Sequence, residues 1–252
     1  YHNHTLLHDD VMDKADMRRG HPTVHTKWNE NTAILSGDQM MIEAYEQLAL
    51  LPDSKLPQVL RWFNDMATAI CEGQQYDIDL ESSTTVAISD YLMMIEKKTA
   101  LLLAYSLRIG AYIAGASEQE QDALFQYGRH IGIAFQIQDD VLDVYGDPSN
   151  FGKAIGGDIC CNKKTFLLLT ALDIADAESK ASLLQWLITS NKNAEKIQAV
   201  TALYTQLGVR EIGEAVMEDH TAQALAQLEL LPQNEYTNQL RVLAEKLATR
   251  KR

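Results

Sequence analysis

The sequence predicts an all-α fold, and three observations support that prediction. Glycine and proline are scarce, with 13 Gly and 5 Pro in 252 residues, whereas a chain of many short strands needs frequent turn residues. Apolar residues recur at helical spacing along most of the chain, for example Leu60, Phe63 and Ala67. No segment shows the sustained alternation of apolar and polar residues that marks a half-buried strand. Because we find no internal repeat and no low-complexity tract, we expect one all-α domain over residues 1–252.

Start and stop signals divide the helical pattern into segments. Gly20 and Pro22 end the first piece, Pro52 ends the second, and Ser117 is an N-cap residue further along the chain. We expect helices, in chain order, over residues 1–16, 31–51, 56–75, from N-cap residues at 82–85 to 102, then 117–142, 166–174, 177–190, 194–207, 209–229 and 235–250.

A glycine-rich segment interrupts the helices between Tyr145 and Lys164. It contains four glycines, one proline and several charged residues. Loops of this length inside compact domains are commonly functional. We therefore expect this loop to contribute to a binding or catalytic site.

Composition excludes several classes of protein. The chain has 35 acidic and 22 basic side chains and a formal net charge of −13, which argues against general nucleic-acid binding. A bound cation or a local basic cluster still permits an anionic substrate. No stretch reaches the ~18–20 apolar residues of a membrane span, and no signal-peptide pattern is present. Three cysteines are too few for a disulfide framework, so we expect a reduced, cytoplasmic protein.

The strongest chemical signal is a motif of the form D-D-x-x-D that occurs twice. The first copy is Asp9-Asp10-Val11-Met12-Asp13, and the second is Asp139-Asp140-Val141-Leu142-Asp143. Both copies lie in segments predicted to be helical, where positions i and i+4 share a face. The first and last aspartates of each copy therefore point the same way. Like charges one turn apart destabilise an isolated helix, and folding does not require them.

A divalent cation resolves this repulsion. Mg²⁺ takes oxygen ligands, keeps several waters and is usually held by one or two carboxylates plus substrate phosphates. One D-D-x-x-D is often only a solvated acidic face, but two copies, each beside apolar sequence, are poorly explained in that way. The residues predicted to hold Mg²⁺ and to clamp a diphosphate are Asp9, Asp10, Asp13, Asp139, Asp140 and Asp143.

Basic residues lie close in sequence to both motifs. Arg18 and Arg19 follow the first motif, and arginine forms bidentate hydrogen bonds with phosphate oxygens. Lys153 and Lys163, or its neighbour Lys164, lie in the glycine-rich loop after the second motif. A lone basic residue is more often a solvated charge, so it is the proximity to the aspartate motifs that favours phosphate binding.

Taken together, these segments resemble the trans-isoprenyl diphosphate synthases, also called polyprenyl synthetases, which include farnesyl and geranylgeranyl diphosphate synthases. The matching segments run in family order over residues 1–165: Leu6–Asp13, Arg18–Thr23, Gly73–Asp77, Lys98-Thr99, Gly132–Asp143, Gly152-Lys153 and Asp158–Thr165. The resemblance implies the isoprenoid synthase fold, a helical bundle around a central active-site cavity, in a single polyprenyl synthetase domain. The family's helices before the first aspartate motif have no counterpart in this sequence, so we expect a fold that lacks those N-terminal helices.

The resemblance also implies a reaction, which is head-to-tail prenyl transfer. An allylic diphosphate ionises, and isopentenyl diphosphate attacks the resulting carbocation while Mg²⁺ stabilises the leaving diphosphate. Arg18 resembles a ligand of the allylic diphosphate, and Arg19 resembles a ligand of isopentenyl diphosphate. The remaining catalytic and substrate-binding residues that the resemblance implies are Lys98, Thr99, Gln136, Lys153 and Lys163. Among them, Thr99 and Gln136 would supply oriented dipoles beside the carbocation.

Three other functions remain open, namely a longer-chain polyprenyl diphosphate synthase, a class I terpene cyclase and a non-catalytic subunit of a heteromeric synthase. A cyclase usually mixes Asn or Asp, Ser or Thr, and Glu in its second metal motif. Non-catalytic subunits commonly lose one or both aspartate motifs. The intact motif from Asp139 to Asp143 favours the transferase, and the family implies a homodimer.

Two further groups carry weaker signals. We expect Asp77, Asp79 and Glu81 to be solvated or to support the site rather than to bind metal. His4 and His8 are four residues apart, as two zinc ligands can be, but they lack the glutamate of H-E-x-x-H, so zinc is disfavoured.

Product length is expected to depend on residues just upstream of the first motif, where the family places the floor of the prenyl-tail pocket. Thr5 lies one helical turn before Asp9, Tyr1 lies two turns before it, and His4 flanks them at about 7–8 Å along the axis. Tyr1, His4 and Thr5 therefore form the predicted chain-length pocket and predict C15–C20 products, with C20 slightly favoured. The alternative is that His4 only packs against a neighbouring helix while Ile42 or a partner subunit sets the floor.

Overall fold

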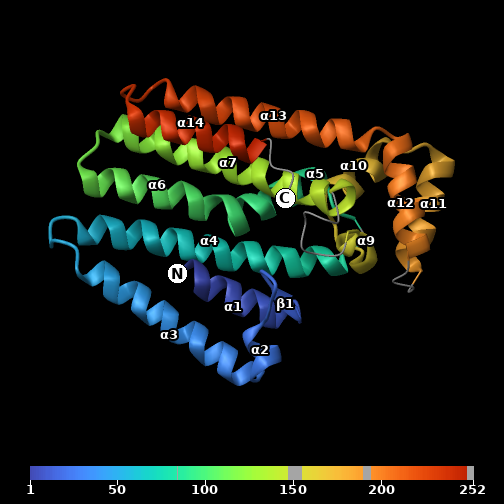
Figure 1. The fold of residues 1–252 in the computed structure, drawn as a ribbon, viewed down its shortest axis with the longest axis horizontal. Coiled ribbons are helices and arrows are strands. Elements are labelled where there is room, and N and C mark those ends of the chain that lie inside the picture. Colours follow the sequence, from blue (N-terminus) through green and yellow to red (C-terminus); the bar gives the residue numbers. More distant parts are fainter. Residues whose placement is uncertain (84, 147–154, 190–193, 249–252) are drawn as a thin grey trace. The chain divides into compact units, whose positions relative to one another are not determined.

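The computed structural model describes residues 1–83, 85–146, 155–189 and 194–248, and helices dominate these ranges. The chain divides into two compact units, Tyr1–Asn64 and Asp65–Arg252, and each is described by itself (Figure 1). The all-α prediction is confirmed, while the single domain over 1–252 stays a prediction. Within the described ranges, no helix is both long and apolar enough to cross a membrane.

Most helices begin and end close to the predicted positions. The first unit contains α1 (His2–Met12), α2 (Val24–Lys27), α3 (Glu30–Ala49) and the beginning of α4 (Leu56–Ser82). The second unit contains the rest of α4, then α5 (Ile88–Ile95), a π-helix η1 (Glu96–Ala100), α6 (Leu101–Ala114), α7 (Glu118–Tyr145), α9 (Gly157–Cys161), α10 (Phe166–Ile174), α11 (Ala177–Ile188), α12 (Ala194–Gln206), α13 (Val209–Leu228) and α14 (Glu235–Ala248).

Several boundaries differ from the prediction, which also missed α2; for example, the helical run expected to end at residue 102 continues to Ala114. Helix α4 continues to Ser82, so the N-cap residues expected at 82–85 do not begin the next helix. That helix starts after Ala87, whose backbone N–H donates to Asp90 Oδ2 at 3.0 Å. The predicted loop contains the short helix α9, which its glycines concealed, and residues 147–154 of that loop lie outside the described ranges.

A small antiparallel hairpin follows α1, where the sequence indicated only a break. Strand β1 (Met17–Arg18) pairs with β2 (His21–Pro22). The two loop residues, Arg19 and Gly20, have φ angles of 51° and 77°, as a type I′ turn requires. Strands of two residues are too short to show alternation, which is why the sequence pattern did not reveal them.

In the first unit, α1 packs on α3 through two histidines. The imidazole of His4 donates from Nδ1 to the Gly37 carbonyl at 3.0 Å, and His8 donates from Nε2 to the Ile34 carbonyl at 3.1 Å. A Cβ on Gly37 would lie 2.3 Å from His8 Nε2. Glycine is therefore required at this position of α3, because the His8 ring lies across it.

The long helix α7 is the centre of the second unit. Helices α6, α13 and α14 pack along it, as does η1 (Figure 1). Two glycines permit the close approach of α6 and η1. A Cβ on Gly128 would lie 2.8 Å from Ala104 Cα, and one on Gly132 would lie 2.4 Å from Ala100 Cα.

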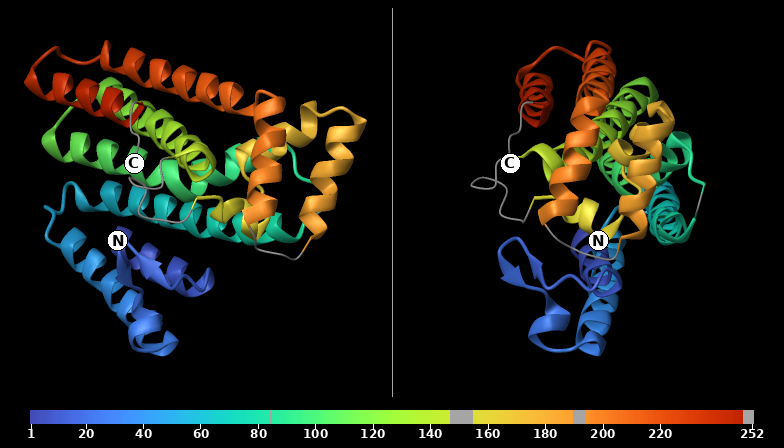
Figure 2. Two further views of the ribbon diagram at one scale, coloured as in Figure 1. Left: turned by 45° about the vertical axis from the view of Figure 1, so that its right-hand side comes forward. Right: turned by 90° about the vertical axis from the view of Figure 1, so that its right-hand side faces the viewer.

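Helices α9, α10, α11 and α12 gather at one end of α7, where α11 and α12 run across the direction of α7 and α13 (Figures 1 and 2). The apolar core at this end includes the fully buried side chains of Ile137, Leu167 and Val209. A second apolar core, around Tyr127 and Leu228, joins α7 to α13 and α14. The C-terminal part of α7, which carries the second aspartate motif, is thus fixed by several helices.

Candidate active site

The first aspartate motif lies in the last turn of α1. The Asp13 backbone N–H donates to the Asp9 carbonyl at 2.8 Å, so the helical turn extends to the last aspartate of the motif. Asp10 is only 5% exposed, whereas Asp9 is half-buried and Asp13 is exposed. The three carboxylates therefore occupy different environments, and the middle one faces the protein interior.

Arg18 neutralises the buried side of this motif. Its Nε donates to Asp10 Oδ1 at 2.7 Å, and its second terminal nitrogen donates to Asp9 Oδ2 at 3.2 Å. The hairpin brings Arg18 to this place, and Thr23 anchors the hairpin because its hydroxyl donates to the Ala15 carbonyl at 2.7 Å. Arg19 is exposed at the tip of the turn. The two arginines thus face different surroundings.

The second motif also has a buried middle aspartate. Asp140 is 4% exposed, and its Oδ2 accepts hydrogen bonds from the Tyr91 hydroxyl at 2.6 Å and from the Phe166 backbone N–H at 2.9 Å. Burial raises the pKa of Asp140 to about 7, although the hydrogen bond from Tyr91 opposes this shift. Asp140 therefore ties α7 to α5 and to the start of α10.

Asp143 binds the segment that leads into α9. Its Oδ2 accepts from the Asp158 backbone N–H at 3.0 Å, and its carbonyl accepts from the Gly156 N–H at 2.7 Å. Asp139 is half-buried one helical turn earlier. The glycine-rich segment after the second motif is therefore attached to the motif itself.

Lys98 and Thr99 lie on the π-helix η1, and π-helical turns are frequent at functional sites. Lys98 donates from Nζ to Asp77 Oδ2 at 2.7 Å, and the Thr99 hydroxyl donates to Gln136 Oε1 at 3.1 Å. A Cβ on Gly73 would lie 2.4 Å from the Lys98 backbone nitrogen. The segment from Gly73 to Asp77 thus provides both the space for Lys98 and its carboxylate partner.

From the sequence, Asp77 was expected either to be solvated or to support the site. The structure places it in an ion pair with Lys98. The available signal was the spacing of Gly73 and Asp77, which places both on one face of a helix. The partner is 21 residues away in sequence, so spacing alone did not identify it.

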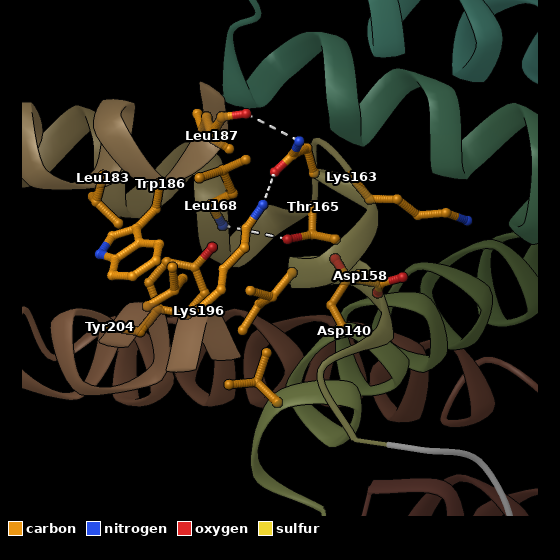
Figure 3. A pocket seen from close by; sticks show the side chains of 14 residues that line it. Asp140, Asp158, Lys163, Thr165, Leu168, Leu183, Trp186, Leu187, Lys196 and Tyr204 are labelled. Carbon is orange, nitrogen blue, oxygen red and sulfur yellow. Dashed lines mark hydrogen bonds between the residues drawn. The ribbon is translucent and has the colours of Figure 1, made fainter. Parts of the chain in front are cut away.

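Lys163 is the second residue after α9, and its backbone N–H donates to the Asp158 carbonyl at 3.0 Å. It lines a pocket together with Asp140 and Asp158, and its side chain extends away from Trp186 and Lys196 (Figure 3). Lys153 lies outside the described residues.

The residues of the predicted chain-length pocket pack within the first unit. The Tyr1 ring meets Phe63 edge-on, with 5.2 Å between ring centroids, and the Thr5 hydroxyl donates to the His2 carbonyl at 2.8 Å. His4 is held against α3 by its bond to Gly37. Such packing against a neighbouring helix was the alternative interpretation of His4. Whether His4 also affects product length stays a prediction.

The donor atoms of the two motifs fit a hard cation bound together with a substrate. Among the described residues, no three His, Cys, Asp or Glu side chains converge to hold a metal ion. The carboxylate oxygens of each motif are hard donors, of the kind that Mg²⁺ takes together with waters and phosphate oxygens. His4 and His8 each hydrogen-bond a carbonyl of α3 through one ring nitrogen.

Comparisons with known proteins identify the family. A family model described as polyprenyl synthetase matches residues 1–205. The chain is 43% identical over 198 residues to a short chain isoprenyl diphosphate synthase of Methanocaldococcus jannaschii, covering 78% of this chain and 60% of that relative. The chain thus spans less than two thirds of that relative's length.

Solved structures agree with this match. The fold is similar to a crystal structure of geranylgeranyl pyrophosphate synthase, with a TM-score of 0.93 and 40% identity, covering all of this chain and 78% of the other. It is also similar to a geranylgeranyl pyrophosphate synthase from Corynebacterium glutamicum solved with isoprenyl diphosphate and magnesium, with a TM-score of 0.88, 33% identity, and 98% and 75% of the two chains covered. The fold is therefore the isoprenoid synthase fold, and the chain belongs to the polyprenyl synthetase family.

Proposed function

We propose that this protein is a Mg²⁺-dependent short-chain prenyl diphosphate synthase. It joins isopentenyl diphosphate head to tail with an allylic diphosphate and releases a C15–C20 prenyl diphosphate. Membership of the polyprenyl synthetase family supports this proposal. So do the names of its relatives, which are short-chain isoprenyl and geranylgeranyl diphosphate synthases.

The observation that carries the proposal is the shared design of the two aspartate motifs. In each motif the middle aspartate is buried and bonded within the protein, Asp10 to Arg18 and Asp140 to Tyr91. The first and last aspartates lie one helical turn apart on a common face, although Asp143 is also buried and accepts the Asp158 backbone N–H. A purely structural acidic helix has no need for two such arrangements, whereas cations bound to a diphosphate take carboxylate oxygens as ligands.

Asp9, Asp13 and Asp139 are the proposed metal ligands, with Asp10, Asp140 and Asp143 in supporting positions. Bound Mg²⁺ would act as a Lewis acid that stabilises the negative charge developing on the leaving diphosphate. The relative from Corynebacterium glutamicum was solved with magnesium and isoprenyl diphosphate, which supports the choice of metal.

The basic residues are proposed to bind the diphosphates directly. Arg18 serves the allylic diphosphate and is oriented by its bonds to Asp9 and Asp10. Lys98 is oriented by Asp77 in the same way. Charged donors that are held in place before the reaction stabilise developing charge most effectively, because they need no reorganisation. Lys153 and Lys163 are proposed to add donors after the second motif, and Arg19 is proposed to bind isopentenyl diphosphate.

Thr99 and Gln136 are proposed to stabilise the carbocation. The Thr99 hydroxyl proton is directed to Gln136 Oε1, so the lone pairs of the threonine oxygen point elsewhere and form an oriented dipole. A fixed dipole stabilises positive charge without offering the mobile nucleophile that water would be. The protein is further proposed to act as a cytoplasmic homodimer.

The test is mass analysis of the products. The full-length protein is incubated with Mg²⁺, isopentenyl diphosphate and, in turn, dimethylallyl, geranyl or farnesyl diphosphate. We expect a C15–C20 prenyl diphosphate, a loss of at least about 100-fold in kcat for Asp139→Asn, and an unchanged rate for Asp173→Asn, an exposed aspartate of α10. A cyclic hydrocarbon formed without isopentenyl diphosphate would indicate a cyclase, and no product at all would indicate a non-catalytic subunit.

A further inference from the structure

Lys196 of α12 is a buried residue to which the proposed function assigns no role. It is 1% exposed, which is rare for lysine because an ammonium loses its hydration when buried. Its Nζ donates to Asn162 Oδ1 at 2.5 Å and to the Thr189 carbonyl at 3.4 Å. Figure 3 shows its side chain directed into the pocket between Trp186 and Thr165. The buried ammonium therefore restrains the groups to which it donates, which are the Asn162 side chain and the Thr189 carbonyl.

Asn162 is the residue at which the chain leaves α9. Its φ is 55°, in the left-handed region, where asparagine and glycine are the residues that commonly end helices. Its side-chain nitrogen donates to the Leu187 carbonyl at 3.0 Å, while its side-chain oxygen accepts from Lys196. Because both halves of the amide are held, the left-handed turn that leads into Lys163 has a defined orientation.

The other end of α9 also lies against α12. Gly156 has φ 78°, and a Cβ there would lie 2.7 Å from Ile197 Cγ2. The Gly156 N–H donates to the Asp143 carbonyl. Two consecutive residues of α12, Lys196 and Ile197, therefore contact the two ends of α9. A helix of five residues is not stable by itself, so these contacts and those to Asp143 determine where α9 lies.

We propose that Lys196 is a positioning residue for diphosphate binding, acting through Asn162 on Lys163. The ammonium fixes the Asn162 amide, the amide fixes the left-handed turn, and the turn sets the direction in which the Lys163 side chain leaves the backbone. This inference rests on the proposed function, since it assigns Lys163 to the diphosphate. It goes beyond that function by placing one determinant of diphosphate affinity on α12, in a residue that does not touch the substrate.

The test compares Lys196→Met with Asn162→Gly. Methionine keeps the length and the apolar stem of lysine but removes the ammonium, whereas glycine keeps the left-handed backbone but removes the amide. Each variant should weaken binding of Mg²⁺-pyrophosphate about tenfold, as loss of a well-placed charged hydrogen bond does. The apparent KM for the allylic diphosphate should rise by a similar factor, and kcat should change less. Lys180→Met, an exposed lysine of α11, should leave both quantities unchanged.

Amide hydrogen exchange provides a second readout that does not depend on activity. Exchange should accelerate in residues 157–163 of both variants and remain slow in α7 and α13. The double variant should bind Mg²⁺-pyrophosphate no more weakly than either single variant, because the two residues act in one chain of contacts. If Lys196→Met does not fold, Asn162→Gly decides the question.

The proposal would be overturned if a folded Lys196→Met or Asn162→Gly variant bound pyrophosphate as tightly as the unaltered protein. This holds even if the variant is less stable. Additive losses in the double variant would overturn it as well. If the unaltered protein neither bound Mg²⁺-pyrophosphate nor made product, the proposed function would fail. In that case the exchange experiment would still show whether Lys196 holds α9.

Discussion

Asp10 and Asp140 occupy the same place in their motifs and meet the same physical difficulty. A carboxylate removed from water is costly unless charged or hydrogen-bonding groups replace the lost hydration. Arg18 supplies a charge for Asp10, whereas Asp140 receives two neutral donors and has its pKa raised to about 7 by burial. The two motifs are therefore alike in sequence and differ in electrostatics, since Asp10 is in an ion pair with Arg18 whereas Asp140 has only neutral donors and a raised pKa.

A pair of histidines, the buried His130 of α7 and the half-buried His220 of α13, makes the fold sensitive to acid. Their Nδ1 atoms are 3.0 Å apart, so one ring donates, the other accepts, and both cannot be protonated. Burial, with help from His220 and Arg129, lowers the pKa of His130 to about 4, although Glu96 and Asp219 oppose this. Burial also lowers the pKa of His220.

The unfolded chain therefore binds more protons than the folded chain between about pH 4 and pH 6.5, and stability rises with pH in that window. We predict that the free energy of unfolding falls as pH drops from 6.5 to 4, by at most about 3 kcal/mol from His130. Urea denaturation at several pH values measures this fall. The fall in the free energy of unfolding should be smaller in His130→Gln. It should be unchanged in His21→Gln, because His21 is exposed. If the free energy of unfolding fell equally with pH in His130→Gln and in the unaltered protein, the histidine pair would not be the cause of the fall.

At the residue scale, sequence spacing predicted the aspartates of both motifs but not the partners that hold them. Tyr91 and Phe166 are 49 and 26 residues from Asp140, and no local pattern connects residues so far apart. Lys196 gave no signal at all, because its burial depends on how α9, α11 and α12 pack. A periodic pattern shows which face of a helix is buried, and it does not show which polar group on that face has a partner.

At the scale of the elements, close helix packing at glycines is the feature most open to testing. We predict that Gly73→Ala lowers the free energy of unfolding by about 1–3 kcal/mol, because the new Cβ would meet the Lys98 backbone at 2.4 Å. The shift of η1 should also raise the apparent KM for the allylic diphosphate, since Lys98 moves with it. Urea denaturation and steady-state kinetics measure the two effects.

Gly110→Ala is the matched control for this substitution. Gly110 lies within α6, and a Cβ there would have no neighbour within 4 Å. This variant should be more stable by up to about 1 kcal/mol, because alanine favours the helix over glycine. If both alanine variants changed stability in the same direction and by the same amount, close packing at Gly73 would not be the cause.

The position of His4 on α1 provides a prediction about product length. Its bond to the Gly37 carbonyl fixes the ring beside Tyr1 and His8. If these rings close the prenyl-tail pocket, His4→Ala should shift the products to longer chains, as mass analysis would show. Asn3→Ala, at an exposed neighbouring position, should not. An unchanged product distribution with normal turnover in His4→Ala would assign His4 to helix packing alone.

Helix positions were largely predictable because apolar periodicity and caps act locally. The helix α10 begins and ends where the pattern placed it, at residues 166 and 174, and Ser117 caps α7 as expected. The short helix α9 was missed because its glycines resemble loop residues and its stability comes from distant contacts. The π-helix η1 was missed since its sequence reads as a continuation of the helix before it.

At the scale of the whole molecule, the formal charge of −13 and the proposed diphosphate substrates present an electrostatic conflict. Only bound cations and well-placed basic residues can make an anionic protein attract a second anion. The central claim of the proposed function is that both aspartate motifs are needed to bind Mg²⁺ together with diphosphate. Neither motif should then hold metal strongly by itself.

Calorimetric titration of Mg²⁺ with and without pyrophosphate tests this claim most directly. Pyrophosphate should tighten Mg²⁺ binding at least about tenfold, because Mg²⁺ loses its waters readily only when phosphate oxygens replace them. Asp9→Asn and Asp139→Asn should each abolish this coupling, and Asp173→Asn should preserve it. Equal Mg²⁺ affinity in the two titrations, or coupling that survives in either motif variant, would contradict the account.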